Sequence, residues 1–210
     1  RTMTGNNSAR GRGRRRLLLL VLLFAAPVLS AYALYFCAPE DWQPQGRTNR
    51  GHLISPVRPV EALALHDVNG GRLDTSLFQQ KWTLLLIGPS ACDEACANTL
   101  YNTRQVRTAL GKDTHRVQRL YVATDRAHIE ELQALLAREH PDLKLAVVEG
   151  AEIYGIDRWL TAEDRSPLKN ASDIYLLDPH GNWFMYYTAQ DPPRGLLKDL
   201  KKVLRLSKIG

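Results

Sequence analysis

The sequence predicts an α/β fold in which a mostly parallel central sheet is covered by helices. The clearest strand is the continuous apolar run WTLLLIG at 82–88, which is typical of a strand buried on both faces of a sheet. Helical and strand patterns then alternate, with a helix over 93–110, a strand over 117–124, a helix over 126–140 and a strand over 143–149. Such alternation is typical of strand–helix–strand units with parallel strands, which place helices over the sheet.

Shorter patterns complete the predicted domain at both of its ends. VEALALHD at 60–67 alternates like a strand, and the NGG at 69–71 marks a turn. Near the C-terminus, DIYLLD and NWFMYY flank PHGN, a pattern that predicts an antiparallel hairpin over 173–187. GLLKDLKKVLRL at 195–206 predicts a closing amphipathic helix. Because the hairpin adds antiparallel pairing, we expect a mixed sheet.

The N-terminal part of the chain predicts a membrane anchor. Residues 1–16 form a basic tail with six of the 28 Lys and Arg residues and no acid, and residues 17–36 are uncharged and mostly apolar. A helix of that length reaches about 30 Å, the hydrocarbon thickness of a bilayer. The proline-rich stretch 37–59 is predicted to be a linker, and the globular domain is expected over 60–210.

Flanking charges predict how this segment is oriented. Arginines precede it and acidic residues follow it. By the positive-inside rule the tail is then cytoplasmic, and the domain lies on the periplasmic face of the cytoplasmic membrane as part of a single-pass protein. Two alternatives stay open: a signal peptide cleaved after AYA at 31–33, and a lipoprotein signal ending at Cys37, which the bulky residues at 34–36 disfavour. The other 22 Lys and Arg balance 22 Asp and Glu, so nucleic acid is not an expected partner.

Three cysteines occur in the sequence, and two of them are placed to act together. Cys92 and Cys96 follow the buried strand, on the expected first turn of a helix, whose N-terminus favours a thiolate. Their spacing puts both sulfurs on one helix face, which suits a disulfide or the capture of a soft cation such as Cu(I). Asp93 and Glu94 act in the opposite direction, because nearby negative charge stabilises the thiol. Cys37 is left at the membrane edge, as an inert residue or an intermolecular partner.

Three segments carry a family resemblance: GGRLDTSLFQQKWTLLLIGPSACDEAC at 70–96, LYVATD at 120–125 and IYLLDPHGNW at 174–183. They resemble the CxxxC block, the next strand and the terminal hairpin of the Sco/SenC family of membrane-anchored copper chaperones. The resemblance extends over about residues 60–205. It implies a thioredoxin-like fold, a role in cytochrome c oxidase assembly, and Cu(I) ligands at Cys92 and Cys96.

The chain departs from the family pattern at three positions. Asp93 and Ala97 stand where the family usually has a proline after each cysteine, and Asn170 falls where the family has a histidine as its third copper ligand. Two thiolates can hold Cu(I) in near-linear geometry without that ligand. By topology, Asn170, Ser172 and Asp173 are expected near the sulfurs, where they could orient a ligand or a substrate backbone.

Other potential ligands receive simpler interpretations. His180 lies at the expected hairpin tip, about 20 Å from the cysteine edge at about 3.3 Å per residue, and is interpreted as a turn residue. Met185 is expected in the core. The remaining histidines are expected in linker, turn, strand-end or exposed helix positions and receive no role: His52, His66, His115, His128 and His140.

Three functions remain open at this point. The first is a Sco-like assembly factor that binds Cu(I) or keeps oxidase copper-site cysteines reduced, with an oxidase subunit or other assembly factors as partners. The second is a thiol–disulfide oxidoreductase for other extracytoplasmic clients, in which Cys92 attacks and Cys96 resolves. The third is a scaffold that binds an assembly partner, with the cysteines as a passive clip. The sequence contains none of the P-loop, GxGxxG, HExxH and GxSxG motifs that would indicate other chemistries.

Overall fold

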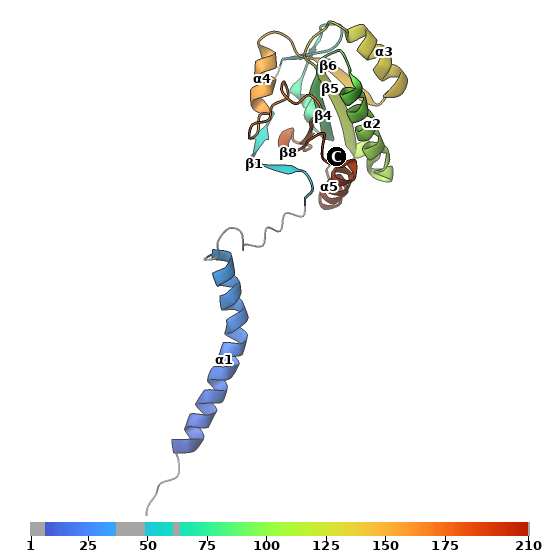
Figure 1. Ribbon diagram of the computed structural model, residues 1–210. Helices are drawn as coiled ribbons and strands as arrows, with labels where there is room; N and C mark the ends of the chain where they lie inside the picture. Colours follow the sequence, from blue (N-terminus) through green and yellow to red (C-terminus); the bar gives the residue numbers. More distant parts are fainter. Residues whose placement is uncertain (1–6, 37–48, 61–63, 210) are drawn as a thin grey trace, which may run out of the picture. The chain divides into compact units, whose positions relative to one another are not determined.

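The computed structural model describes residues 7–36, 49–60 and 64–209, with side chains from Arg14 onward. The chain divides into two units, Arg1–Thr48 and Asn49–Gly210 (Figure 1). The first contains helix α1, Asn7–Phe36. Its stretch Arg14–Phe36 is long and apolar enough to cross a membrane and supports the predicted N-terminal anchor. Cys37 lies outside the described residues.

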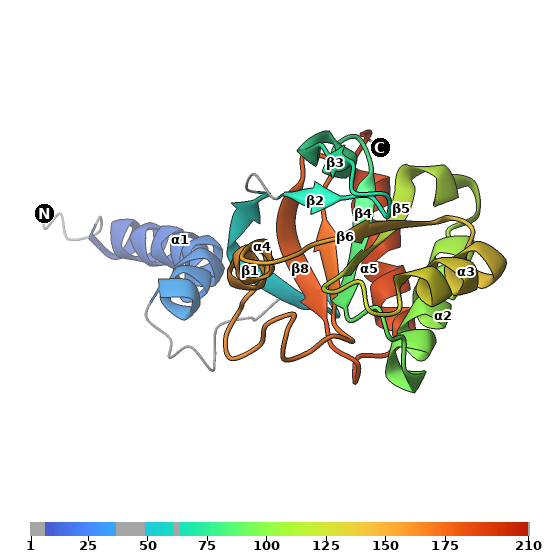
Figure 2. The same ribbon diagram turned by 90° about the horizontal axis from the view of Figure 1, so that it is seen from above.

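In the described part of the second unit, eight strands form one mixed sheet in the order β1-β8-β7-β4-β5-β6-β2-β3 (Figure 2). β4 pairs in parallel with β5, and β5 with β6, whereas the other pairings are antiparallel. The predicted mixed α/β sheet is therefore confirmed. The strands are β1 (His52–Pro59), β2 (Leu65–His66), β3 (Arg72–Leu73), β4 (Trp82–Gly88), β5 (Val117–Ala123), β6 (Leu143–Val147), β7 (Ile174–Leu177) and β8 (Asn182–Tyr187).

Helices cover both faces of this sheet (Figure 2). They are α2 (Glu94–Thr108), α3 (Ile129–Glu139), α4 (Glu152–Trp159) and α5 (Pro193–Leu206), with short 3-10 helices at Thr75–Phe78 and Gly111–Arg116. One core joins α2, α3 and α5 to the side of β4 that carries Leu84 and Leu86, and a second joins α4 to the side that carries Leu85 and Ile87. Because both faces of β4 are buried, its sequence is apolar apart from the buried Thr83.

Residues 49–59 belong to the domain, so the linker predicted over 37–59 is wrong for this part. β1 forms one edge of the sheet and pairs antiparallel with β8. Only Ile54 of β1 is buried, so the strand lacks the alternating pattern that would reveal it, and an edge strand tolerates its prolines. The remaining part of the predicted linker, 37–48, lies outside the described residues.

Two other segments differ from the prediction. The strand expected over 60–67 is described only as the two-residue β2, and residues 61–63 lie outside the described ones. The eight-residue helix α4 was not predicted. It has only eight residues and contains Gly155, a weak helix former, so the segment does not stand out as a helix in the sequence. Packing of Ile156 and Trp159 against the second core stabilises it instead.

A buried carboxylate on α5 binds backbone amides near the start of the second unit and holds them against the helix. Asp199 is 3% exposed, and its Oδ2 accepts hydrogen bonds from the amides of Arg50 (2.6 Å) and Gly51 (3.0 Å) and from the Tyr187 hydroxyl (2.6 Å). Burial raises the pKa of Tyr187, and the hydrogen bond to Asp199 raises it further, so the hydroxyl remains a donor. A Cβ on Gly51 would lie 2.5 Å from the Tyr187 ring, so only glycine fits there.

An arginine lies in the middle of the apolar strand β5. Arg119 is completely buried; it donates to the Leu100 carbonyl at 2.8 Å and lies 3.2 Å from the Asp142 carboxylate. Arg107 shares this carboxylate at 3.3 Å. Burial lowers the pKa of Arg119, and Asp142 opposes this effect. His140 is also buried, not exposed as expected; burial, and then the charge of Arg119, lower its pKa.

Candidate redox site

The cysteine pair lies where the chain passes from β4 to α2. A disulfide joins Cys92 to Cys96, and their Cα atoms are 5.3 Å apart. Cys96 is in the first turn of α2, but Cys92 precedes the N-cap residue Asp93 and is therefore outside the helix, contrary to the expectation from the sequence. Both cysteines are partly buried against the core.

Asp93, which stands in place of a family proline, caps the helix. Its Oδ1 accepts a hydrogen bond from the Cys96 amide at 2.8 Å. This amide is one of the N–H groups at the helix start that would otherwise be free to stabilise a thiolate. The cap also places a carboxylate inside the loop that the disulfide closes. Asp93 therefore stabilises α2 while making the surroundings of the sulfurs less favourable to negative charge.

Tyr121 on β5 contacts the second cysteine. Its hydroxyl oxygen lies 3.8 Å from the Sγ of Cys96 and donates a hydrogen bond to the Pro89 carbonyl at 2.8 Å. Burial, with a smaller contribution from nearby carboxylates, raises the pKa of Tyr121, so the hydroxyl keeps its proton. Gly88 permits this contact, because a Cβ there would lie 2.7 Å from the hydroxyl. The sequence analysis missed Tyr121, since its strand shows only that it is buried.

A hydrogen-bonded network connects the cysteine loop to the start of α3. The Asp125 carboxylate accepts hydrogen bonds from the Ser90 hydroxyl, the Ser90 amide (3.2 Å) and the Ala127 amide (3.0 Å). The Ser90 hydroxyl oxygen in turn accepts from the His128 amide at 2.8 Å. Burial works to raise the pKa of Asp125, but these hydrogen bonds outweigh it and hold the pKa below its usual value. The carboxylate is therefore ionised at neutral pH.

A groove with a volume of about 290 Å³ opens beside Cys92. The loop after β4 and the first turns of α3 form its walls, and its lining residues are Ser90, Ala91, Cys92, Asp93, His128, Glu131, Leu132 and Leu135. From the sequence, His128 received no role. The side chain is exposed, as expected, but the fold brings it to the same groove as Cys92, some 36 positions away in sequence.

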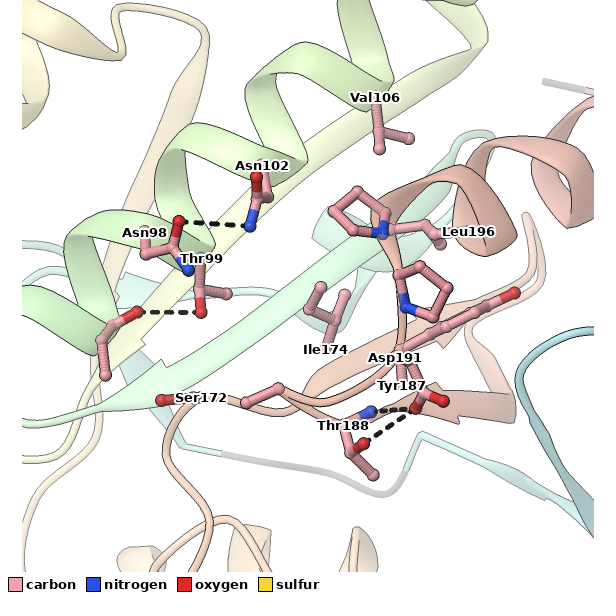
Figure 3. A pocket seen from close by; sticks show the side chains of 14 residues that line it. Asn98, Thr99, Asn102, Val106, Ser172, Ile174, Tyr187, Thr188, Asp191 and Leu196 are labelled. Carbon is pink, nitrogen blue, oxygen red and sulfur yellow. Dashed lines mark hydrogen bonds between the residues drawn. The ribbon is translucent and has the colours of Figure 1, made fainter.

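A second hollow lies between α2, the end of β8 and the start of α5 (Figure 3). Asn98 and Asn102 follow one another along α2 on one side, and Thr188 donates to Asp191 at 2.9 Å on the other (Figure 3). Its volume is about 70 Å³, and no cysteine is among the described residues that line it. The groove beside Cys92 is therefore the better substrate site.

The loop before β7 places the three polar residues that were expected near the sulfurs. β7 pairs with β4, so this loop reaches the same edge of the sheet as the cysteine loop. Asp173 is buried and accepts two hydrogen bonds from Arg165, at 2.9 and 2.7 Å, so its carboxylate is already engaged. Ser172 lines the second hollow, whereas Asn170 lines neither that hollow nor the groove beside Cys92.

Within the described residues, no group of three or more His, Cys, Asp or Glu side chains is arranged to hold a metal ion. Cys92 and Cys96, once reduced to thiolates, remain a two-sulfur candidate site for Cu(I). The amide of His180 donates to Asp178 at 2.9 Å within the hairpin turn, as a turn residue does. Met185 is 3% exposed in the core, as predicted.

The fold and the site define a thioredoxin-like domain with a cysteine pair at the start of its first long helix. A family model described as the transmembrane-like, thioredoxin-like, C-terminal domain matches residues 82–207, and the chain belongs to this family. The matched range begins with β4, includes both cysteines and ends just after α5. No curated protein matches the sequence.

Solved Sco structures have the same fold. Copper-bound ScoI of Bradyrhizobium japonicum is 22% identical, with a TM-score of 0.53 over 69% of this chain and 98% of that one. Yeast Sco1 is 16% identical, with a TM-score of 0.61 over 73% and 98%. A thiol:disulfide interchange protein from Bacteroides sp. is 14% identical, with a TM-score of 0.53 over 72% and 91%. These likenesses confirm the resemblance to the Sco/SenC family at the level of the fold.

Proposed function

We propose that this protein is a membrane-anchored, extracytoplasmic thiol–disulfide reductant that acts in the assembly of a respiratory cytochrome c oxidase. Its clients would be the copper-site cysteines of an oxidase subunit. The observation that carries the proposal is the unequal placement of the two sulfurs. Cys92 lines an open groove outside the helix, whereas Cys96 lies in the first turn against the buried Tyr121. The resemblance to Sco proteins supports the choice of client.

On the basis of this placement, we assign a role to each sulfur. In the reduced protein, the Cys92 thiolate attacks a client disulfide, forms a mixed disulfide and releases one client thiolate. The Cys96 thiolate then attacks the Cys92 sulfur and releases the second client thiolate. Two electrons pass from the cysteine pair to the client, and the pair is left as the disulfide that the structure contains. An extracytoplasmic dithiol reductant must restore the thiols before the next turnover.

Delivery of Cu(I) is a second candidate function, favoured by the fold shared with copper-bound Sco structures. The two sulfurs suit Cu(I), which accepts a pair of thiolates as soft ligands. Asn170 supplies no imidazole at the position of the family's third ligand, so the copper would be held by Cys92 and Cys96 alone.

Trapping of the mixed disulfide tests the first function. The full chain in detergent is reduced and mixed with a peptide closed by one disulfide. Cys96→Ser should accumulate a covalent adduct through Cys92, because the resolving step is lost. Cys92→Ser should give little adduct, because Cys96 does not line the groove and lies against the buried Tyr121. Equal trapping by both variants, or by neither, would contradict the assigned roles.

Two further measurements separate the alternatives. Titration of the reduced protein with Cu(I) against a competing chelator should show one-to-one binding, lost in Cys92→Ser/Cys96→Ser, if copper is carried. Oxidase assembly in cells that express only the double variant reports on the scaffold function. Normal assembly there would exclude both forms of cysteine chemistry.

A further inference from the structure

We propose that the groove beside Cys92 selects clients with a basic side chain next to the attacked disulfide, together with an apolar side chain that enters the groove. This inference rests on the proposed reductant function and names the client segment that the site would accept. The occupant is an extended segment of the client polypeptide, which must lie beside Cys92 while the mixed disulfide exists.

The described lining of the groove contains acidic side chains and lacks lysine and arginine. Among the described residues that line it are two carboxylates, Asp93 and Glu131, and the imidazole of His128, but neither Lys nor Arg. Asp125 adds a further negative charge behind the Ser90 wall. Arg126, in the same loop as Asp125, is engaged elsewhere, because it is bound to Glu149 at 2.7 Å and to a backbone carbonyl. The groove therefore complements a positive charge.

The remaining surface suits one apolar side chain. Leu132 and Leu135 lie on neighbouring turns of α3 and line the groove; Leu132 belongs to the core, whereas Leu135 is partly exposed. The volume of about 290 Å³ is just below the range of about 300–1,000 Å³ that is usual for cofactor and small-molecule pockets. A peptide side chain fits this space better than a bound cofactor does.

The two walls of the groove are held together before a client arrives. The Ser90 hydroxyl accepts from the His128 amide and donates to Asp125, so the cysteine loop and the start of α3 share one hydrogen-bonded network. The Asp93 carboxylate is fixed by the Cys96 amide. A preformed groove loses little conformational freedom on binding, which favours selection by charge.

Two peptides test the proposal, identical except that the residues beside their single disulfide are Lys in one and Glu in the other. The rate at which the reduced full chain, in detergent, reduces each peptide is divided by the rate with dithiothreitol, which corrects for the peptide's own reactivity. The Lys peptide should react about fivefold faster, since an exposed charge pair contributes a factor of up to about five. This ratio should fall with added salt.

A matched pair of variants locates the effect. Glu130 and Glu131 both lie in the first turn of α3 and both are exposed, but only Glu131 lines the groove. Glu131→Lys should abolish or reverse the preference for the Lys peptide, and Glu131→Gln should reduce it. Glu130→Lys changes the charge of the helix by the same amount but should leave most of the preference for the Lys peptide intact.

The neutral substrate hydroxyethyl disulfide separates failure of this inference from failure of the proposed function. If the reduced protein converts this substrate but reduces both peptides at equal normalised rates, the groove does not select by charge. If Glu130→Lys has the same effect as Glu131→Lys, the preference comes from the general field of the domain and the inference is wrong. If hydroxyethyl disulfide is not reduced at all, the reductant function itself fails.

Discussion

Reduction of the Cys92–Cys96 disulfide is expected to lower the free energy of unfolding of the domain by about 2 kcal/mol. The bond joins residues four positions apart. When chain entropy alone is considered, closing a loop of about four to five residues removes about 6–7 cal/mol/K from the unfolded chain, which is about 2 kcal/mol at about 25 °C. Reduction returns this entropy to the unfolded chain and so favours unfolding.

Stabilisation of a thiolate in the reduced, folded protein would act in the opposite direction, but the structure provides little of it. Cys92 lies outside the helix, and the Cys96 amide is bonded to Asp93. The Tyr121 hydroxyl donates to the Pro89 carbonyl, so its proton is already engaged. The loop entropy should therefore dominate. Since about 30 mV corresponds to about 1.4 kcal/mol for two electrons, folding should lower the reduction potential of the pair by about 40 mV.

Urea unfolding of the full chain in detergent, with and without dithiothreitol, measures this difference. Three tryptophans in the domain, Trp82, Trp159 and Trp183, are buried and report unfolding by fluorescence. The Cys92→Ser/Cys96→Ser variant should show no dependence on reductant. A reduced domain that is as stable as the oxidised one, or more stable, would refute the reasoning, because thiolate stabilisation would then exceed the loop entropy.

Three further perturbations test interactions elsewhere in the domain. Asp142→Ala should lower the free energy of unfolding, measured with urea, by about 3–5 kcal/mol, because it leaves Arg119 buried without its counter-charge. Arg119→Met should lower it by less, because Asp142 is partly exposed and keeps its contact with Arg107. Equal losses in the two variants would contradict this reasoning. Asp199→Asn should cost about 2–4 kcal/mol, because three donors, two of them buried, lose a charged acceptor. Unchanged stability would show that these bonds contribute nothing net. Stability should also decrease as the pH falls below 6.5, the ordinary pKa of histidine, because the pKa of His140 is lowered in the folded protein and the unfolded chain binds the proton more readily. His140→Gln should flatten this part of the pH profile, and an unchanged slope would exclude His140 as its source.

The centre of the fold could be predicted from the sequence because local patterns and tertiary environment agree there. The apolar run at 82–88 is buried on both faces, and the helix predicted over 93–110 is capped by Asp93, where the prediction began it. The hairpin over 173–187 has its turn at the predicted PHGN. In each case one short segment contains the whole signal.

The edge of the sheet and much of the site could not be predicted, because their causes lie far apart in sequence. β1 is a strand only because β8 lies beside it. Arg119 interrupts an apolar strand and is accommodated by a carbonyl on α2 and a carboxylate before β6. Tyr121 and His128 reach the cysteine site through the pairing of β5 with β4, which brings the loop after β5 next to the loop after β4.

Two of the three departures from the Sco/SenC pattern, Asp93 and Asn170, affect the reduced state. Asp93 engages the Cys96 amide and adds negative charge beside the sulfurs, and Asn170 supplies no imidazole for a bound cation. Neither residue stabilises free thiolates. The disulfide, in contrast, lies in a loop that is fixed on one side by the hydrogen bonds of Ser90 and on the other by the Asp93 cap of α2. Folding then stabilises the disulfide relative to the dithiol, which lowers the reduction potential of the pair and favours electron transfer to a client disulfide of higher potential. This asymmetry suits a protein that reduces the cysteines of others and must itself be reduced from outside.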